Sequence, residues 1–79
     1  MHVIEVLGPG CANCQAVEKA AREAVAVSGI EAEIRKVIDY RAIAAYGVMH
    51  TPGLVIDGKL ASAGRIPSVE EISGWLRAG

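Results

Sequence analysis

The spacing of apolar residues changes several times along the 79-residue chain, and each change indicates a different element. Residues Met1–Leu7 form an almost continuous β-branched apolar run that ends at Gly8–Gly10, which is typical of a central strand buried on both faces. In Cys11–Val27, apolar residues recur at steps of three and four among good helix formers. This segment is predicted to be a helix that ends at Gly29.

The next segment predicts a second strand and a short helix. Residues Ile30–Ile38 alternate apolar and charged side chains until Val37, which favours a half-exposed strand at the edge of the sheet. Asp39 can cap the Ala-rich segment Tyr40–Tyr46, which Gly47 closes. We expect a helix of about two turns there.

The last third of the chain predicts a hairpin and a final helix. Asp57-Gly58 between the runs Leu54–Ile56 and Lys59–Ala61 favours a type I′ turn, which joins two antiparallel strands. Ser68–Glu71 forms a capping box that opens a last amphipathic helix. The order β-α-β-α-β-β-α predicts an α/β fold in which a right-handed crossover pairs the first two strands in parallel, and the hairpin completes a four-stranded mixed sheet.

Length, charge and hydropathy limit the number of domains and the kinds of partner that this chain can have. A chain of 79 residues builds one core, so residues 1–79 are expected to form a single domain and a monomer. The net charge is −1 and both signs are scattered, so neither nucleic acid nor a membrane surface is expected as a partner. No apolar run reaches the roughly 20 residues of a membrane span, and no export signal precedes the first strand, which indicates a cytoplasmic protein.

The two cysteines are the candidate catalytic residues. Cys11 and Cys14 would close too small a loop to act as a structural staple. They stand where a strand ends and a helix begins, so free N–H groups and the positive helix dipole favour a thiolate at Cys11. Residues three apart share a helix face, so Cys14 can resolve a mixed disulfide formed by Cys11. The alternative, that both only fill the core, fits a glycine-rich loop less well.

The same spacing also suits metal binding. Soft thiolates hold copper(I) or zinc, and Cys11 and Cys14, with or without His50, would also fit zinc or half of an iron–sulfur cluster shared across a dimer. Small copper chaperones run β-α-β-β-α-β and end on a strand, whereas this chain ends on a capped helix. The predicted order therefore favours disulfide chemistry, while a purely structural adaptor that uses the edge strand leaves the thiols unexplained.

Thr51-Pro52 stands just before the hairpin. Pro52 cannot donate a hydrogen bond to a neighbouring strand, so it leaves a backbone gap that another chain could occupy. A cis Thr51–Pro52 bond is one hypothesis, and base rates alone favour an ordinary trans bond.

Three segments together carry a resemblance to a known family, namely Gly8-Pro9-Gly10-Cys11-Ala12-Asn13-Cys14, Gly47-Val48-Met49-His50-Thr51-Pro52-Gly53, and Asp57-Gly58 with Gly64-Arg65-Ile66-Pro67-Ser68. Over nearly its whole length the chain resembles the thioredoxin-like superfamily, in its branch of small redox-active disulfide proteins. The resemblance implies helices on both sheet faces, a cis Pro52 beside the cysteines, and substrate backbone docking against Thr51. It implies a protein-disulfide reductase without a bound organic cofactor or metal, whose partners are disulfide-bearing proteins and a thioredoxin-reductase-type electron donor.

Two further residues are candidate modulators. Glu5 stands six residues before Cys11, at the position that resembles the family's buried acid, where a desolvated carboxylate could accept the Cys14 proton. The alternative is that Glu5 points to solvent. His50 could favour the Cys11 thiolate when it is protonated, or could simply be solvated. Common thioredoxins carry Trp before the first cysteine and Gly-Pro between the two, whereas this chain has Gly10 and Ala12-Asn13.

Overall fold

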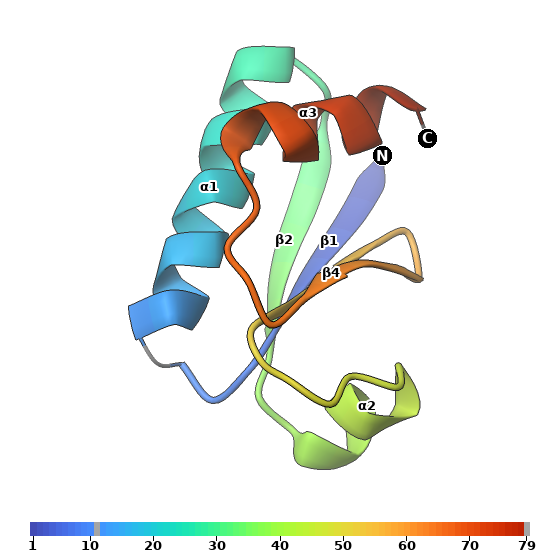
Figure 1. The fold of residues 1–79 in the computed structure, drawn as a ribbon. Helices are drawn as coiled ribbons and strands as arrows, with labels where there is room; N and C mark the ends of the chain where they lie inside the picture. Colours follow the sequence, from blue (N-terminus) through green and yellow to red (C-terminus); the bar gives the residue numbers. More distant parts are fainter. Residues whose placement is uncertain (11, 79) are drawn as a thin grey trace.

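The computed structural model describes residues 1–10 and 12–78, and its elements follow the predicted order β-α-β-α-β-β-α. The strands are β1 (His2–Leu7), β2 (Ala32–Val37), β3 (Gly53–Ile56) and β4 (Lys59–Ala63), and the helices are α1 (Ala12–Ser28), α2 (Tyr40–Ala45) and α3 (Val69–Ala78). Figure 1 shows α2 at the end of the sheet where β1 and β2 finish. Among the described residues, no helix is long and apolar enough to span a membrane.

The four strands form one mixed sheet in the order β2-β1-β3-β4. β1 pairs in parallel with β2 and antiparallel with β3, and β3 pairs antiparallel with β4. The predicted central strand and the predicted edge strand are therefore both confirmed. Because β1 lies inside the sheet, the chain leaves its C-terminal end at the centre of one end of the sheet, and α1 begins shortly afterwards.

Helices cover both faces of the sheet, as predicted. On one face, α1 and α3 pack on the sheet through a large core of buried side chains, namely Ile4, Val6, Val17, Ala21, Ala24, Leu54, Ile56, Ile72 and Leu76. On the other face, the short helix α2 covers a smaller core made of Leu7, Ile43 and Val55. Alternate residues of β1 thus pack into two different cores, which is why this strand is apolar nearly throughout.

Local hydrogen bonds and backbone angles confirm three predictions about turns and caps. The Asp39 carboxylate accepts a hydrogen bond from the Arg41 N–H at 3.1 Å and so caps α2. Ser68 and Glu71 exchange side-chain to backbone hydrogen bonds of 3.1 Å each, which completes the capping box of α3. Asp57 and Gly58 have φ angles of 51° and 82°, as a type I′ turn requires.

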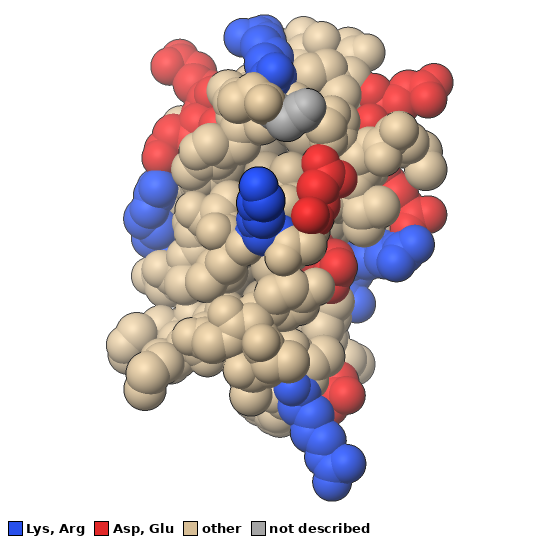
Figure 2. All heavy atoms as spheres, turned by 90° about the vertical axis from the view of Figure 1, so that its right-hand side faces the viewer, with Lys and Arg blue, Asp and Glu red and all other residues tan. Residues whose placement is uncertain are grey.

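The second strand is shorter than predicted. β2 covers Ala32–Val37 instead of Ile30–Ile38, because the Ile30 N–H donates to the Ser28 hydroxyl at 3.3 Å as the chain leaves α1. Ile38 is 65% exposed and lies beyond the strand. The surface is mixed in charge: Figure 2 shows both signs interspersed on the displayed face, and a basic side chain projects from its lower end.

Candidate active site

Cys14 lies in the first turn of α1, which begins at Ala12 shortly after the glycine-rich loop that follows β1. Its side chain is buried, with 4% of its surface exposed. The first turn of a helix carries unsatisfied N–H groups and the positive end of the helix dipole, and both favour a thiolate. Cys11, the predicted attacking thiol, lies outside the described residues.

Gly8, Cys14 and Thr51 converge on one small volume. A Cβ atom built on Gly8 would come closer than 3.0 Å to the Cys14 Sγ and would lie 3.6 Å from the Thr51 Cβ. The φ angle of Gly8 is +154°, which side-chain-bearing residues rarely adopt. The Cys14 sulfur therefore rests against the backbone of Gly8, close to the residue that precedes Pro52.

The Thr51–Pro52 peptide bond is cis, as the resemblance implies. Pro52 is buried, whereas Thr51 is exposed. The Pro52 carbonyl accepts a hydrogen bond from the Gly64 N–H at 2.8 Å, which ties the bend before β3 to the end of β4. The structure thus brings Cys14 and Thr51 together, although they are far apart in the sequence, and leaves Thr51 open to solvent.

A cavity of about 80 Å³ opens beside Cys14. Its described lining residues come from β1, α1, the end of β2 and the loops beside them, namely Val6, Gly8, Gly10, Cys14, Gln15, Glu18, Lys36 and Ile38. The Glu18 carboxylate pairs with the Lys36 ammonium at 3.1 Å and with the Arg22 guanidinium at 2.8 Å. Hydrogen bonds from Arg22 and then Lys36 lower the pKa of Glu18 below its usual value, so this side chain is ionised at neutral pH.

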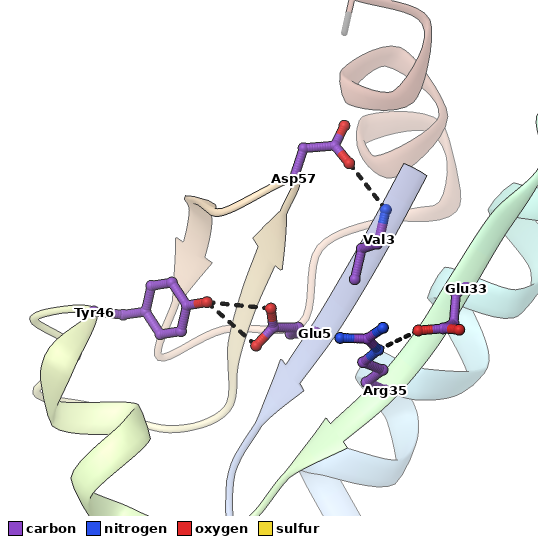
Figure 3. Close-up of polar contacts among 6 residues, drawn as sticks. All are labelled: Val3, Glu5, Glu33, Arg35, Tyr46 and Asp57. Carbon is purple, nitrogen blue, oxygen red and sulfur yellow. Dashed lines mark hydrogen bonds and ion pairs between the residues drawn. The ribbon is translucent and has the colours of Figure 1, made fainter. Parts of the chain in front are cut away.

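Glu5 lies on the sheet face that α2 covers. Its neighbours Ile4 and Val6 belong to the core under α1, so the alternation of a strand turns Glu5 to the opposite side. The Tyr46 hydroxyl donates to the two Glu5 carboxylate oxygens at 3.1 and 3.3 Å (Figure 3). Burial, followed by the hydrogen bond to Glu5, raises the pKa of the Tyr46 hydroxyl. Glu5 is thus half-buried and hydrogen bonded, and proton transfer from Cys14 to Glu5 stays a prediction.

The two histidines lie at different places. His50 is exposed and packs beside Gly64, where a Cβ would come within 3.1 Å of the His50 Cβ. It is not among the described residues that line the cavity at Cys14, and its effect on the thiols also stays a prediction. His2 pairs with the Asp57 carboxylate, which also accepts a hydrogen bond from the Val3 N–H at 2.9 Å (Figure 3 shows the Val3 contact). This contact fastens the hairpin turn to the start of β1.

Comparison with known proteins agrees with this geometry. The family profile described as "Thioredoxin domain" matches residues 2–77. The chain belongs to the thioredoxin family. It is 49% identical over 76 residues to a thioredoxin of Methanothermobacter thermautotrophicus, which covers 96% of this chain and 99% of that protein. It is also 42% identical over 78 residues to a thioredoxin of Methanocaldococcus jannaschii, which covers 99% of this chain and 90% of that protein.

In this member of the thioredoxin family, the motifs of the sequence did not point to Glu18 and Lys36, the charged residues among the described lining of the cavity. Glu18 follows Cys14 by four residues, so helical spacing alone places both side chains on one face of α1. That signal was available in the sequence. The position of Lys36 was not, because it depends on the register in which β2 pairs with β1, where Lys36 stands opposite Val6.

The alternative of a metal centre gains no support from the described part of the chain. There, no group of three or more histidine, cysteine, aspartate or glutamate side chains is arranged to hold a metal ion.

Proposed function

We propose that this protein is a thiol–disulfide oxidoreductase that reduces, or exchanges, disulfides of partner proteins through Cys11 and Cys14. The observation that carries the proposal is the meeting of the Cys14 sulfur, the Gly8 backbone and Thr51. Membership of the thioredoxin family supports the same class of chemistry. Glycine at position 8 leaves room for the sulfur, because a Cβ there would come closer than 3.0 Å to the Cys14 Sγ.

In the proposed reaction, the Cys11 thiolate attacks one sulfur of a target disulfide. A bond forms between Cys11 and that sulfur, and the other target sulfur leaves as a thiolate that takes up a proton. The Cys14 thiol then loses its proton and attacks the Cys11 sulfur, so that the bond between Cys11 and the target breaks and the second target sulfur leaves as a thiolate that takes up a proton. The target disulfide gains two electrons and two protons, and the cysteine pair is oxidised to an internal disulfide.

The burial of Cys14 supports its role as the resolving thiol. A sulfur with 4% of its residue exposed does not reach a protein disulfide in solution, whereas it is placed for an intramolecular attack on a neighbour three residues earlier. Attack by Cys11 first, and resolution by Cys14 second, is the order that this exposure favours.

Exposed apolar side chains support docking of a partner protein near the cysteines. Ile38 lines the cavity at Cys14 and is 65% exposed, and Met49, two residues before Thr51, is 88% exposed. Such side chains gain by burial against a partner. We propose that an extended segment of a disulfide-bearing protein lies against Thr51. A thioredoxin-reductase-type donor in the cytoplasm then reduces the cysteine pair again, and this protein itself carries no bound organic cofactor.

The proposal is tested by equilibrating the protein with glutathione or dithiothreitol redox buffers and counting alkylated thiols by mass. A reversible two-electron transition near about −270 mV would mark a reductant, and one near about −120 mV an oxidant. Cys11→Ser should abolish disulfide reduction, whereas Cys14→Ser should trap a mixed disulfide with the target. The proposal is contradicted if the cysteine pair forms no internal disulfide and protein purified anaerobically holds bound metal.

A further inference from the structure

A second cavity lies toward the end of the sheet opposite to the cysteines. Its volume is about 300 Å³, and the described residues that line it are Ile56, Asp57, Lys59, Ala61, Trp75 and Ala78. Ile56 pairs with Ile4 of β1, which stands four residues before Gly8, where the Cys14 sulfur rests. At about 3.3 Å per strand residue, the two places are roughly 13 Å apart along the chain. The proposed exchange reaction therefore makes no use of this cavity.

The cavity opens between the β3–β4 hairpin and the second half of α3, and its inner wall is apolar. Trp75 and Ala61 are partly buried and pack against the core under α1, to which Ile56 belongs. Ala78 adds a methyl group from the last turn of α3, which Figure 1 shows near the start of β1. A cavity of a few hundred Å³ that is lined by an aromatic ring and aliphatic side chains has the size and the lining of a small-molecule site.

Two charged side chains line the exposed part of this cavity, and one of them is already engaged. The Asp57 carboxylate pairs with the His2 Nδ1 at 2.5 Å and accepts a hydrogen bond from the Val3 N–H at 2.9 Å. Lys59 is exposed, and in the part of the chain that the structure describes it takes part in no ion pair. The Lys59 ammonium is therefore the charged group that a ligand in this cavity can meet.

We propose that this cavity binds a small organic anion, namely a molecule with an apolar body and one carboxylate. The apolar body packs against Trp75 and Ile56, and the carboxylate faces the Lys59 ammonium. A neutral molecule of the same shape gains the apolar contact without the ion pair, and a cation is repelled by Lys59. Because the cavity lies away from Cys14, such a ligand leaves the thiol site open, and the inference does not depend on the proposed function.

Three probes that share one body and differ in charge test this inference, namely 3-phenylpropionate, 3-phenylpropanamide and 3-phenylpropylamine. Trp75 is the single tryptophan of the chain, so its fluorescence reports on this cavity. Titration of the whole protein with 3-phenylpropionate at about pH 7 should give a saturable change, with a Kd on the order of 1 mM. The amide should bind about threefold to fivefold more weakly, and the amine more weakly still.

Variants locate the charge and the cavity. Lys59→Met should weaken binding of 3-phenylpropionate about threefold to fivefold and remove the difference between the carboxylate and the amide. Lys19→Met is the matched control, because Lys19 is also exposed but lies on α1, outside this cavity. It should change the Kd by less than about twofold, because distant exposed charges are screened. Ala61→Leu fills the cavity and should abolish binding of all three probes, while its circular dichroism stays that of the parent.

The inference is overturned if the fluorescence of Trp75 shows no saturable change up to about 10 mM 3-phenylpropionate, which is ten times the expected Kd. It is equally overturned if the parent binds the amide as tightly as the carboxylate, or if Lys59→Met weakens binding no more than Lys19→Met. The comparison of the three probes uses the parent protein alone, so it decides the question even if Ala61→Leu fails to fold.

Discussion

Replacing Gly8 with alanine tests whether the Cys14 sulfur rests against the backbone of the loop after β1. The added methyl group would come closer than 3.0 Å to the Cys14 Sγ, whereas carbon atoms in contact normally lie about 3.5–4.0 Å apart. Sulfur is no smaller than carbon, so the sulfur has to move or rotate away. Because Cys14 is buried, such a movement repacks the cavity instead of swinging into solvent.

The expected cost has two parts. Overpacking of a buried site costs about 1–3 kcal/mol. A φ angle of +154° adds backbone strain for any residue with a Cβ, of order 1–3 kcal/mol. The other neighbours of the new methyl group, the Cβ atoms of Cys14 and Thr51, would lie at 3.6 Å, which is ordinary contact. The cost of overpacking therefore comes from the contact with the sulfur alone.

A double-mutant cycle separates the two parts. Gly8→Ala is made in the parent and in Cys14→Ala, and the free energy of unfolding is measured by urea denaturation under reducing conditions. Removal of the sulfur should recover about 1–3 kcal/mol of the cost of Gly8→Ala, while the strain remains in both backgrounds. For a domain of 79 residues, each kcal/mol corresponds to about 4–8 °C in Tm.

Gly10→Ala is the matched control. Gly10 also has a positive φ angle, +87°, but a Cβ there would meet nothing within 4 Å. Its cost should be the same with and without the Cys14 sulfur. If Gly8→Ala also costs the same in both backgrounds, the sulfur does not rest on Gly8, and the geometric argument for the active site is wrong.

Two further predictions follow from charged side chains away from the cysteines. Hydrogen bonds from Arg65 and then from the Ser68 N–H lower the pKa of Glu71 to about 2 from the usual 4.5, so its contribution to stability is complete above about pH 4.5 and is lost as the pH falls toward about 2. Glu71→Gln should therefore flatten the fall in unfolding free energy over this window, and an unchanged slope in acid titrations of the two proteins would contradict this assignment. Because the hydrogen bond to Glu5 adds to burial in raising the pKa of Tyr46, Glu5→Gln should move the tyrosinate absorbance titration of Tyr46 to lower pH, and no movement would mean that the bond is absent in solution.

The local structure of this chain could be predicted well because its signals act within a few residues. Asp39 caps the helix that it precedes, Ser68 and Glu71 complete their box across one turn, and Asp57-Gly58 turns the hairpin in place. Each of these interactions depends on backbone groups no more than three residues away, so tertiary packing had little scope to override it.

The long-range part of the site could not be predicted in the same way. Glu5 was expected either beside the cysteines or in solvent, and the structure joins it to Tyr46, a residue 41 positions later. Which face of β1 each helix covers decides that contact, and a strand pattern that is apolar on both faces carries no information on it. The exposed position of His50 beside Gly64 likewise depends on how the segment before the cis bond meets the end of β4.

By itself, the sequence determined the order of the elements, the placement of Cys14 in the first turn of a helix after a glycine-rich loop, and the family resemblance, because all three depend on residues close together in the chain. Only the tertiary structure decided that Gly8, Cys14 and Thr51 meet, and that Lys36 from β2 joins Glu18 at the cavity beside the sulfur. The physical reason is that these contacts are fixed by strand register and by the packing of α1 on the sheet, which depend on the whole core at once.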